Sequence, residues 1–275
     1  MPRKSVSALT AAPLAIGLAH FAAVTPNTAT HAKAPKHTTT CAVTADDLGG
    51  CPATGCADPK TEAAHALVNR MKRHKPTGPT TDLIFNDLLS LQTQANKLVG
   101  QDKELDKDAR DKLAGMKVKG GNVSEGDSVR LVAFVVGTPK ANSGESVNCN
   151  LKGQANNDFH IPVVAEAGDS DFTGIVAEMI PQTRNPGWTL PKLHALAGTD
   201  RMVRITGQLF YDNIHRVNDD ESDPQSGQPA RSSLWEIHQV TAFDVCMDDK
   251  PCKISEDAGW KPLESVTVKE INAMQ

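Results

Sequence analysis

Apolar residues recur at spacings of three and four between residues 61 and 120. Because such spacings place side chains on one face of a helix, the pattern predicts amphipathic helices over residues 61–75, 82–99 and 103–116. The second is the most regular, and Gly100 would end it. Its expected apolar stripe consists of Ile84, Leu88, Leu91, Ala95 and Leu98. A glycine-rich stretch then closes the helical region, residues 61–120.

From residue 121 the pattern changes to short runs rich in β-branched and aromatic residues, separated by turn residues. These runs predict five strands, over residues 128–136, 158–165, 174–180, 201–211 and 232–246. A short helix is predicted between the third and fourth strands. Thr189 offers its N-cap, Pro191 stands in its first turn, and Gly198 follows its last apolar position.

The order strand, strand, strand, helix, strand, strand is that of an OB-fold, a five-stranded Greek-key barrel. The connections 137–157 and 212–231 are long and polar, as are the loops that flank the binding face of OB-folds. We therefore expect an α+β, mainly β, chain with an OB-fold-like barrel over residues 121–247. The helical region precedes this barrel, and a C-terminal extension, residues 248–275, follows it.

The first 32 residues have the pattern of a secretory signal peptide. Arg3 and Lys4 precede a small and apolar run over residues 8–24, and small residues at a cleavage-like spacing follow. The run is too short and too weakly apolar for a membrane span, and no later stretch qualifies. The sequence therefore predicts a secreted or periplasmic protein, in which residues 33–60 form a polar, cysteine-containing linker.

Export makes disulfides the expected state of the six cysteines. Cys246 and Cys252 flank a turn-like insert, so a local bond is plausible, and Cys51 and Cys56 flank a similar one. A zinc site at the N-terminal cysteines is the alternative, although no C-x-x-C pair occurs. The sequence alone leaves the pairing of the six cysteines open.

The runs "GESVNCNLKGQANNDFHIPVV", "VRITGQLFYDNIHRVN" and "SLWEIHQVTAFDVC" carry a resemblance. Over residues 121–246 the chain resembles an uncharacterised family of exported bacterial OB-fold-like proteins with paired "DFH" and "WEIHP"-like strands. Gln239 stands where that family often has proline, and the lone Cys149 where some relatives have two cysteines. The resemblance implies an OB-like barrel and export, and it implies no particular activity.

Polar residues alternate with apolar ones on the predicted second and fifth strands, and one carboxylate lies on the third. They are Asp158, His160, Glu178, Glu236 and His238. In an OB-fold the third strand pairs with both of the others, so these side chains would converge on one patch of barrel wall. Such a set suits zinc, manganese or nickel, with Asp158, His160, Glu236 and His238 as the expected metal ligands.

A plainer interpretation of the same residues stays open. The solvent face of any antiparallel sheet displays polar side chains, and cross-strand His–Glu pairs stabilise a sheet by about 0.2–1 kcal/mol without a ligand. Alternatively, His238 is a buried, hydrogen-bonded histidine beside Trp235.

Two further features are candidate binding elements. Arg184 and Trp188 precede the short helix and would clamp an anion or stack on a ring, unless Trp188 only packs against the helix start. The acidic run over residues 219–223 could hold calcium, but it lacks the spacing of an EF-hand loop and also suits a solvated loop.

Charge argues against a nucleic-acid partner. Residues 122–247 hold nine Lys and Arg against sixteen Asp and Glu, a net charge of −7 that repels phosphate. The leading hypothesis is thus an exported, non-enzymatic module that binds a small ligand, a glycan, a metal ion or a protein on the barrel face. The alternatives are a metal-dependent hydrolase or phosphodiesterase using the same patch, and a structural envelope protein. A divalent metal ion is the candidate cofactor.

Overall fold

The computed structural model describes residues 40–100, 105–218 and 229–273, all within the compact unit Ala34–Gln275. The expected signal peptide and the acidic run of residues 219–223 lie outside the described residues. None of the described helices has the length and apolar character that crossing a membrane requires.

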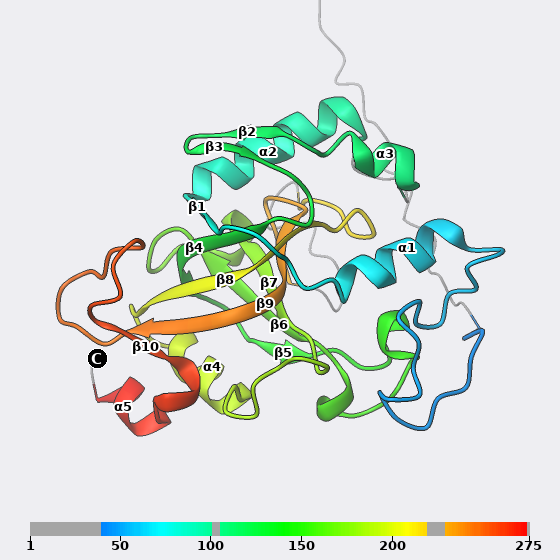
Figure 1. Cartoon of the computed structure of the whole chain (residues 1–275). Coiled ribbons are helices and arrows are strands. Elements are labelled where there is room, and N and C mark those ends of the chain that lie inside the picture. Colours follow the sequence, from blue (N-terminus) through cyan, green and yellow to red (C-terminus); the bar gives the residue numbers. More distant parts are fainter. Residues whose placement is uncertain (1–39, 101–104, 219–228, 274–275) are drawn as a thin grey trace, which may run out of the picture. The chain divides into compact units, whose positions relative to one another are not determined.

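Five strands close into a barrel at the centre of this unit (Figure 1). They are β4 (Ser128–Val135), β6 (Phe159–Val164), β7 (Ile175–Met179), β8 (Met202–Tyr211) and β9 (Trp235–Cys246). Around the barrel the order is β4, β6, β7, β9, β8 and back to β4, with only β7 and β9 parallel among these neighbours. Helix α4 (Leu190–Ala197) connects β7 to β8. This is the OB-fold order, so the predicted fold class is confirmed.

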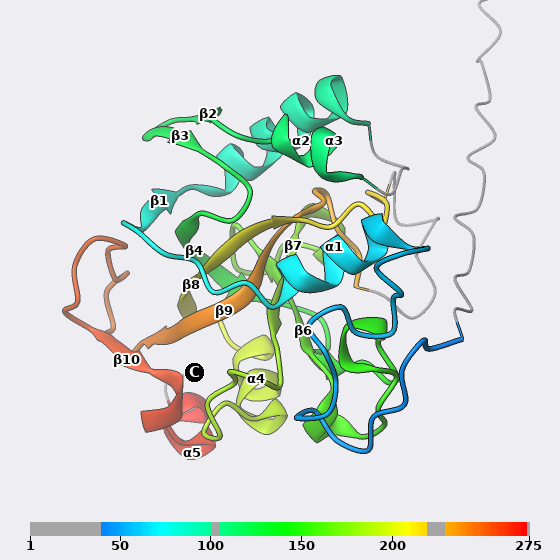
Figure 2. The ribbon, with the colours of Figure 1, turned by 45° about the vertical axis from the view of Figure 1, so that its right-hand side comes forward.

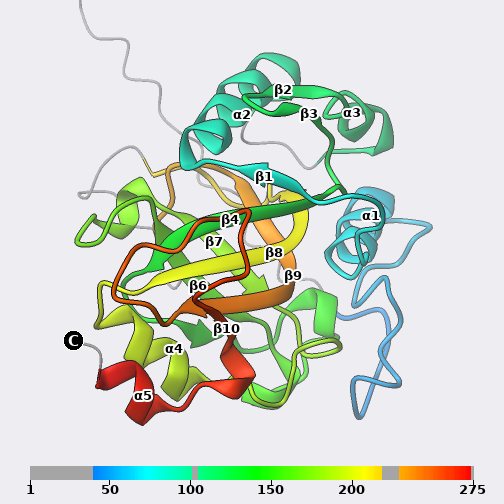
Figure 3. The same ribbon diagram turned by 60° about the vertical axis from the view of Figure 1, so that its left-hand side comes forward.

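Shorter elements extend the barrel. Strand β1 (Thr81–Leu83) pairs with β4, β5 (Lys140–Ala141) with β6, and β10 (Trp260–Pro262) with β9. A hairpin of β2 (Met116–Val118) and β3 (Gly121–Val123) precedes β4. The C-terminal helix α5 (Val268–Asn272) lies beside α4 (Figure 3). The described residues also form four single turns of 3₁₀ helix: η1 (Ser146–Asn148), η2 (Gln154–Asn156), η3 (Asp171–Thr173) and η4 (Leu263–Ser265).

The predicted N-terminal helices are present but shorter than expected. They are α1 (Ala63–Lys72), α2 (Phe85–Leu98) and α3 (Lys107–Asp111). Helix α2 loses its predicted first turn because residues 81–83 pair with β4 as a strand. Two members of its expected apolar stripe, Ile84 and Leu98, are exposed.

The helical region and the barrel share one hydrophobic core. Alternate residues of the strands, such as Leu131, Ile161 and Ile237, form its centre. Leu88 and Leu91 of α2 are fully buried in the same core. The start of β9 is fixed to this helix, because the backbone N–H of Leu234 donates to the Gln92 side chain at 2.7 Å.

Three disulfides join the six cysteines. The pairs are Cys41–Cys56, Cys51–Cys149 and Cys246–Cys252. The local disulfide between Cys246 and Cys252 is as predicted. The prediction of a local disulfide between Cys51 and Cys56 is wrong, because these residues pair with Cys149 and Cys41 instead. Because all three N-terminal cysteines are in disulfides, they offer no thiolates for the zinc site considered above. The Cys51–Cys149 bond instead fixes the N-terminal segment to the loop between β5 and β6.

Gly207 permits the close approach of β8 to β9. The register between these strands shifts at this residue, and a Cβ atom here would lie 2.3 Å from the carbonyl oxygen of Gln239 and 2.6 Å from Cγ2 of Ile237. We expect Gly207→Ala to destabilise the protein by about 1–3 kcal/mol through overpacking. The melting temperature would fall by about 2–10 °C.

Gly198→Ala is the matched control for this substitution. Gly198 follows α4 with a φ of −94°, and an added Cβ would meet its nearest neighbour at 3.7 Å, an ordinary contact. Calorimetry of both variants tests the prediction. Equal melting temperatures for the two would contradict the role given to Gly207.

Candidate metal centre

The five polar residues singled out on the strands lie together on the outer face of the barrel wall. His160 of β6 is directly opposite Glu178 of β7 in the sheet register, and Glu178 is directly opposite His238 of β9. Asp158 immediately precedes β6, and Glu236 lies two residues before His238 on the same face of β9. Glu178 therefore occupies the middle of a row that crosses three strands.

The side chains of this row approach one another closely. Glu178 places Oε1 2.9 Å from Nε2 of His160 and Oε2 2.9 Å from Nδ1 of His238. On the other side of the His238 ring, Nε2 lies 3.6 Å from Oδ2 of Asp158. The Nδ1 atom of His238 is also 3.6 Å from Oε2 of Glu236. Imidazole and carboxylate groups thus alternate through the cluster.

The cluster is buried, which differs from the exposed barrel face expected from the sequence. Each of the five residues is at most 1% exposed. Helix α1 lies over this side of the barrel, and the N-terminal segment lies beside the loop that contains Cys149, to which it is bound by a disulfide (Figure 2). The side-chain amide of Gln208 donates to the carbonyl of Met71 at 2.9 Å, and that of Gln239 to the carbonyl of Arg73 at 3.1 Å. Two barrel side chains thereby bond the end of α1.

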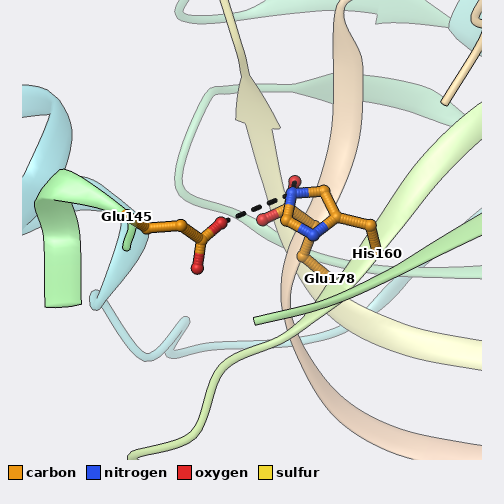
Figure 4. Close-up of side chains that lie close together, drawn as sticks. All are labelled: Glu145, His160 and Glu178. Atoms are coloured by element: carbon orange, nitrogen blue, oxygen red, sulfur yellow. Dashed lines mark ion pairs between the residues drawn. The ribbon is translucent and has the colours of Figure 1, made fainter. Parts of the chain in front are cut away.

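Glu145, which the sequence did not single out, completes one side of the cluster. It lies just before η1 in the loop between β5 and β6, and its Oε1 is 3.6 Å from Nε2 of His160 (Figure 4). Its Oε2 accepts a hydrogen bond from the backbone N–H of Asp158 at 2.9 Å. The side chain of Asn142 approaches the same imidazole nitrogen at 3.1 Å. The length of this loop was the only sequence signal for its involvement.

A network of ion pairs continues from Glu236 away from His238. Arg231 pairs with Glu236 through Nη1, and the same atom is 3.6 Å from Oδ2 of Asp212. Asp212 in turn pairs with His215. Lys72 of α1 is buried beside these carboxylates, with Nζ 5.7 Å from the centre of the Phe210 ring. Among the described residues, Arg231 and Lys72 are therefore buried cations adjoining the cluster.

Burial is the largest influence on the pKa values of the cluster. It lowers the pKa of both imidazoles, but the facing carboxylates, Glu178 first, outweigh it and raise the pKa of His160 to about 9 and that of His238 to about 10. Burial also raises the pKa of Asp158 to about 7, and the charge of Glu145 adds to this effect. In the opposite direction, the two imidazoles overcome burial and hold the pKa of Glu178 well below its usual value. The cluster therefore strongly favours added positive charge.

Many polar atoms in the cluster make no hydrogen bond within the part of the chain that the structure describes. They include both oxygens of Glu178, both ring nitrogens of His238, Oδ2 of Asp158 and Oε2 of Glu236. The 2.9 Å contacts between Glu178 and the imidazoles are thus close approaches of charged groups without hydrogen-bond alignment. Buried polar atoms in native proteins nearly always have partners, so this concentration requires an explanation.

Arg184 and Trp188 do not join the cluster. The Arg184 guanidinium stacks 3.6 Å from the centre of the Phe159 ring and donates to the carbonyl oxygens of Asn157 and Met179. The indole N–H of Trp188 donates to Glu264 at 2.8 Å. Both residues line a separate surface pocket of about 430 Å³. They hold the loop between β7 and α4 in place.

The fold and the cluster together define a disulfide-linked OB-fold barrel with a buried carboxylate–histidine centre on its outer wall. Comparison of the chain with family models, curated proteins and solved structures finds no match. The geometry of the centre is therefore the basis on which its function is inferred.

Proposed function

We propose that this protein is an exported module that binds a divalent metal ion in the buried centre. One observation carries the proposal. Ligand atoms of Asp158, Glu178 and His238 lie within 4.8 Å of one another, are fully buried, and include atoms without hydrogen bonds.

The interatomic distances support a shared ion. Two donors bound at about 2.1 Å to one ion lie about 3.0 Å apart at a right angle and about 3.4 Å apart at the tetrahedral angle. One nitrogen of His160, Nε2, lies 2.9 Å from Oε1 of Glu178 and 3.6 Å from Oε1 of Glu145, and these distances bracket that range. Donors to one ion point at the ion rather than at each other. Short N···O contacts without hydrogen-bond alignment are therefore the expected geometry of a metal site.

The donor set indicates the class of ion. Imidazole nitrogen combined with carboxylate oxygen suits zinc, manganese or nickel, whereas calcium and magnesium prefer oxygen ligands alone. The described cysteines are all in disulfides, so the centre draws on nitrogen and oxygen donors. By the Irving–Williams order we expect Zn²⁺ to bind more tightly than Mn²⁺.

Export is part of the same proposal. Three disulfides suit an oxidising compartment, and the first 32 residues have the signal-peptide pattern. A metal-binding protein of the periplasm or the extracellular space accounts for both features.

Burial favours binding over hydrolysis. A hydrolytic metal site keeps a coordination position open to water and substrate. Here α1 and the loop bearing Glu145 cover the ligands, and Asp158, Glu178 and His238 have no exposed surface. A bulky substrate would have to displace that cover.

Metal analysis and isothermal titration calorimetry of the purified protein test the proposal. We expect Zn²⁺ or Mn²⁺ to bind at micromolar or lower concentration. His238→Ala should weaken binding at least about 100-fold, because it removes a direct ligand. His74→Ala, which truncates an exposed histidine just beyond α1, is the matched control and should bind normally. If the wild-type protein binds none of Zn²⁺, Mn²⁺ and Ni²⁺ at micromolar concentration, the proposal is wrong.

A further inference from the structure

The described residues contain three sets of side chains with the geometry of metal ligands. The sets are Glu145, His160 and Glu178; Asp158, Glu178 and His238; and Asp212, His215 and Glu236. Within each set the ligand atoms lie within 4.8 Å of one another. Glu178 belongs to the first two sets, and it is the residue that connects them.

The two oxygens of Glu178 face different partners. Oε1 lies 2.9 Å from Nε2 of His160, and Oε2 lies 2.9 Å from Nδ1 of His238. Figure 4 shows Glu145, His160 and Glu178 close together. The donors of a single ion lie within about 4.2 Å of one another when each bond is about 2.1 Å long. Because the two histidines fall into different sets, one ion would bind one histidine and leave the other set without a metal ion.

We propose that the centre holds two divalent ions bridged by the carboxylate of Glu178. This inference rests on the proposed function, and it adds the number of ions and the residue that couples them. The outer ion would bind Glu145, His160 and Oε1 of Glu178. The inner ion would bind Asp158, one ring nitrogen of His238 and Oε2 of Glu178. A carboxylate that bridges two ions through its two oxygens holds them about 3.5–4 Å apart.

Burial distinguishes the two positions. The side chain of Glu145 is 14% exposed, whereas Asp158, Glu178 and His238 have no exposed surface. The outer ion is therefore the one nearer to solvent, and it would exchange first with chelators.

The third set does not extend the centre to a third ion. Arg231 already pairs with Glu236 through its guanidinium, and Asp212 already pairs with His215. A guanidinium supplies the positive charge that an ion would otherwise bring. In the first two sets no Lys or Arg forms an ion pair with Glu178 or Asp158 among the described residues, and Lys72 acts on Glu178 through its charge without an ion pair.

Metal stoichiometry and electron paramagnetic resonance of the full-length mature protein loaded with Mn²⁺ test this inference. We expect two ions per chain and the spectrum of an exchange-coupled Mn²⁺ pair. Glu145→Gln should remove the outer ion, leaving one ion per chain with the spectrum of an isolated Mn²⁺. Asp158→Asn should remove the inner ion with the same spectroscopic result. Glu166→Gln, which neutralises an exposed carboxylate just beyond β6, should keep both ions and their coupling.

The outcomes separate this inference from the proposed function. One uncoupled ion in the wild-type protein would overturn the bridged pair but leave the metal-binding function standing. Two ions without coupling would overturn the bridging role of Glu178. No bound ion would overturn both proposals. If a variant fails to fold, the wild-type stoichiometry and spectrum still decide between these results.

Discussion

Glu178→Gln is expected to weaken divalent metal binding strongly while the barrel stays folded. Glu178 is the only residue shared by the two candidate ligand sets, with one oxygen 2.9 Å from each histidine. The substitution removes the negative charge and replaces one oxygen by an amide nitrogen, which does not bind metals. We expect affinity for Zn²⁺ and Mn²⁺ to fall by about 100-fold or more, measured by isothermal titration calorimetry.

Glu166→Gln provides the control for charge alone, because Glu166 is exposed and lies outside every candidate ligand set. Circular dichroism would show that both variants keep their β structure. Wild-type affinity in folded Glu178→Gln would show that Glu178 is not a ligand.

The double variant Cys51→Ser, Cys149→Ser should lose more stability than the double variant Cys246→Ser, Cys252→Ser. The bond joins residues 98 positions apart, whereas Cys246–Cys252 joins residues 6 apart. Chain-entropy reasoning assigns about 4–5 kcal/mol to a loop of the first size and about 2 kcal/mol to one of the second. The bond also fixes the N-terminal segment to the loop that carries Glu145, so its loss should loosen the cover of the metal centre as well.

Urea unfolding of this double variant and of Cys246→Ser, Cys252→Ser measures the difference. A smaller loss for the Cys51–Cys149 pair than for the Cys246–Cys252 pair would contradict the argument. Metal release to a chelator should also be faster in the first double variant than in the second.

The sequence predicted the barrel well because its strands carry local signals. In β9, apolar Trp235 and Ile237 alternate with Glu236 and His238, so both the strand and its two faces could be assigned. Strand β1 was missed because three residues are too few for a pattern, and its pairing partner β4 lies more than forty residues away. The third predicted helix was too long, since among the described residues of its range only 107–111 are helical, after the N-cap Asp106.

The candidate site was predictable only in part. Alternation on the strands indicated which residues share a face, and the OB-fold order brought those faces together. A buried His238 was one of the alternatives, but burial of the whole cluster was not predicted, because it depends on α1 and on a disulfide between distant cysteines. Glu145 and Arg231 were missed for a related reason. Each lies outside the five barrel strands, where side-chain direction has no period.

The hydrophobic core shared by α2 and the barrel sets the size of the cooperative folding unit. Leu88 and Leu91 have no surface exposed to water, and Gln92 bonds the backbone at the start of β9. Separating the helices from the strands would hydrate apolar surface on both sides of the cut. The helical region, which in the sequence looks separate from the barrel, thus contributes to the free energy of unfolding of the barrel. Heat should therefore melt both regions in a single transition.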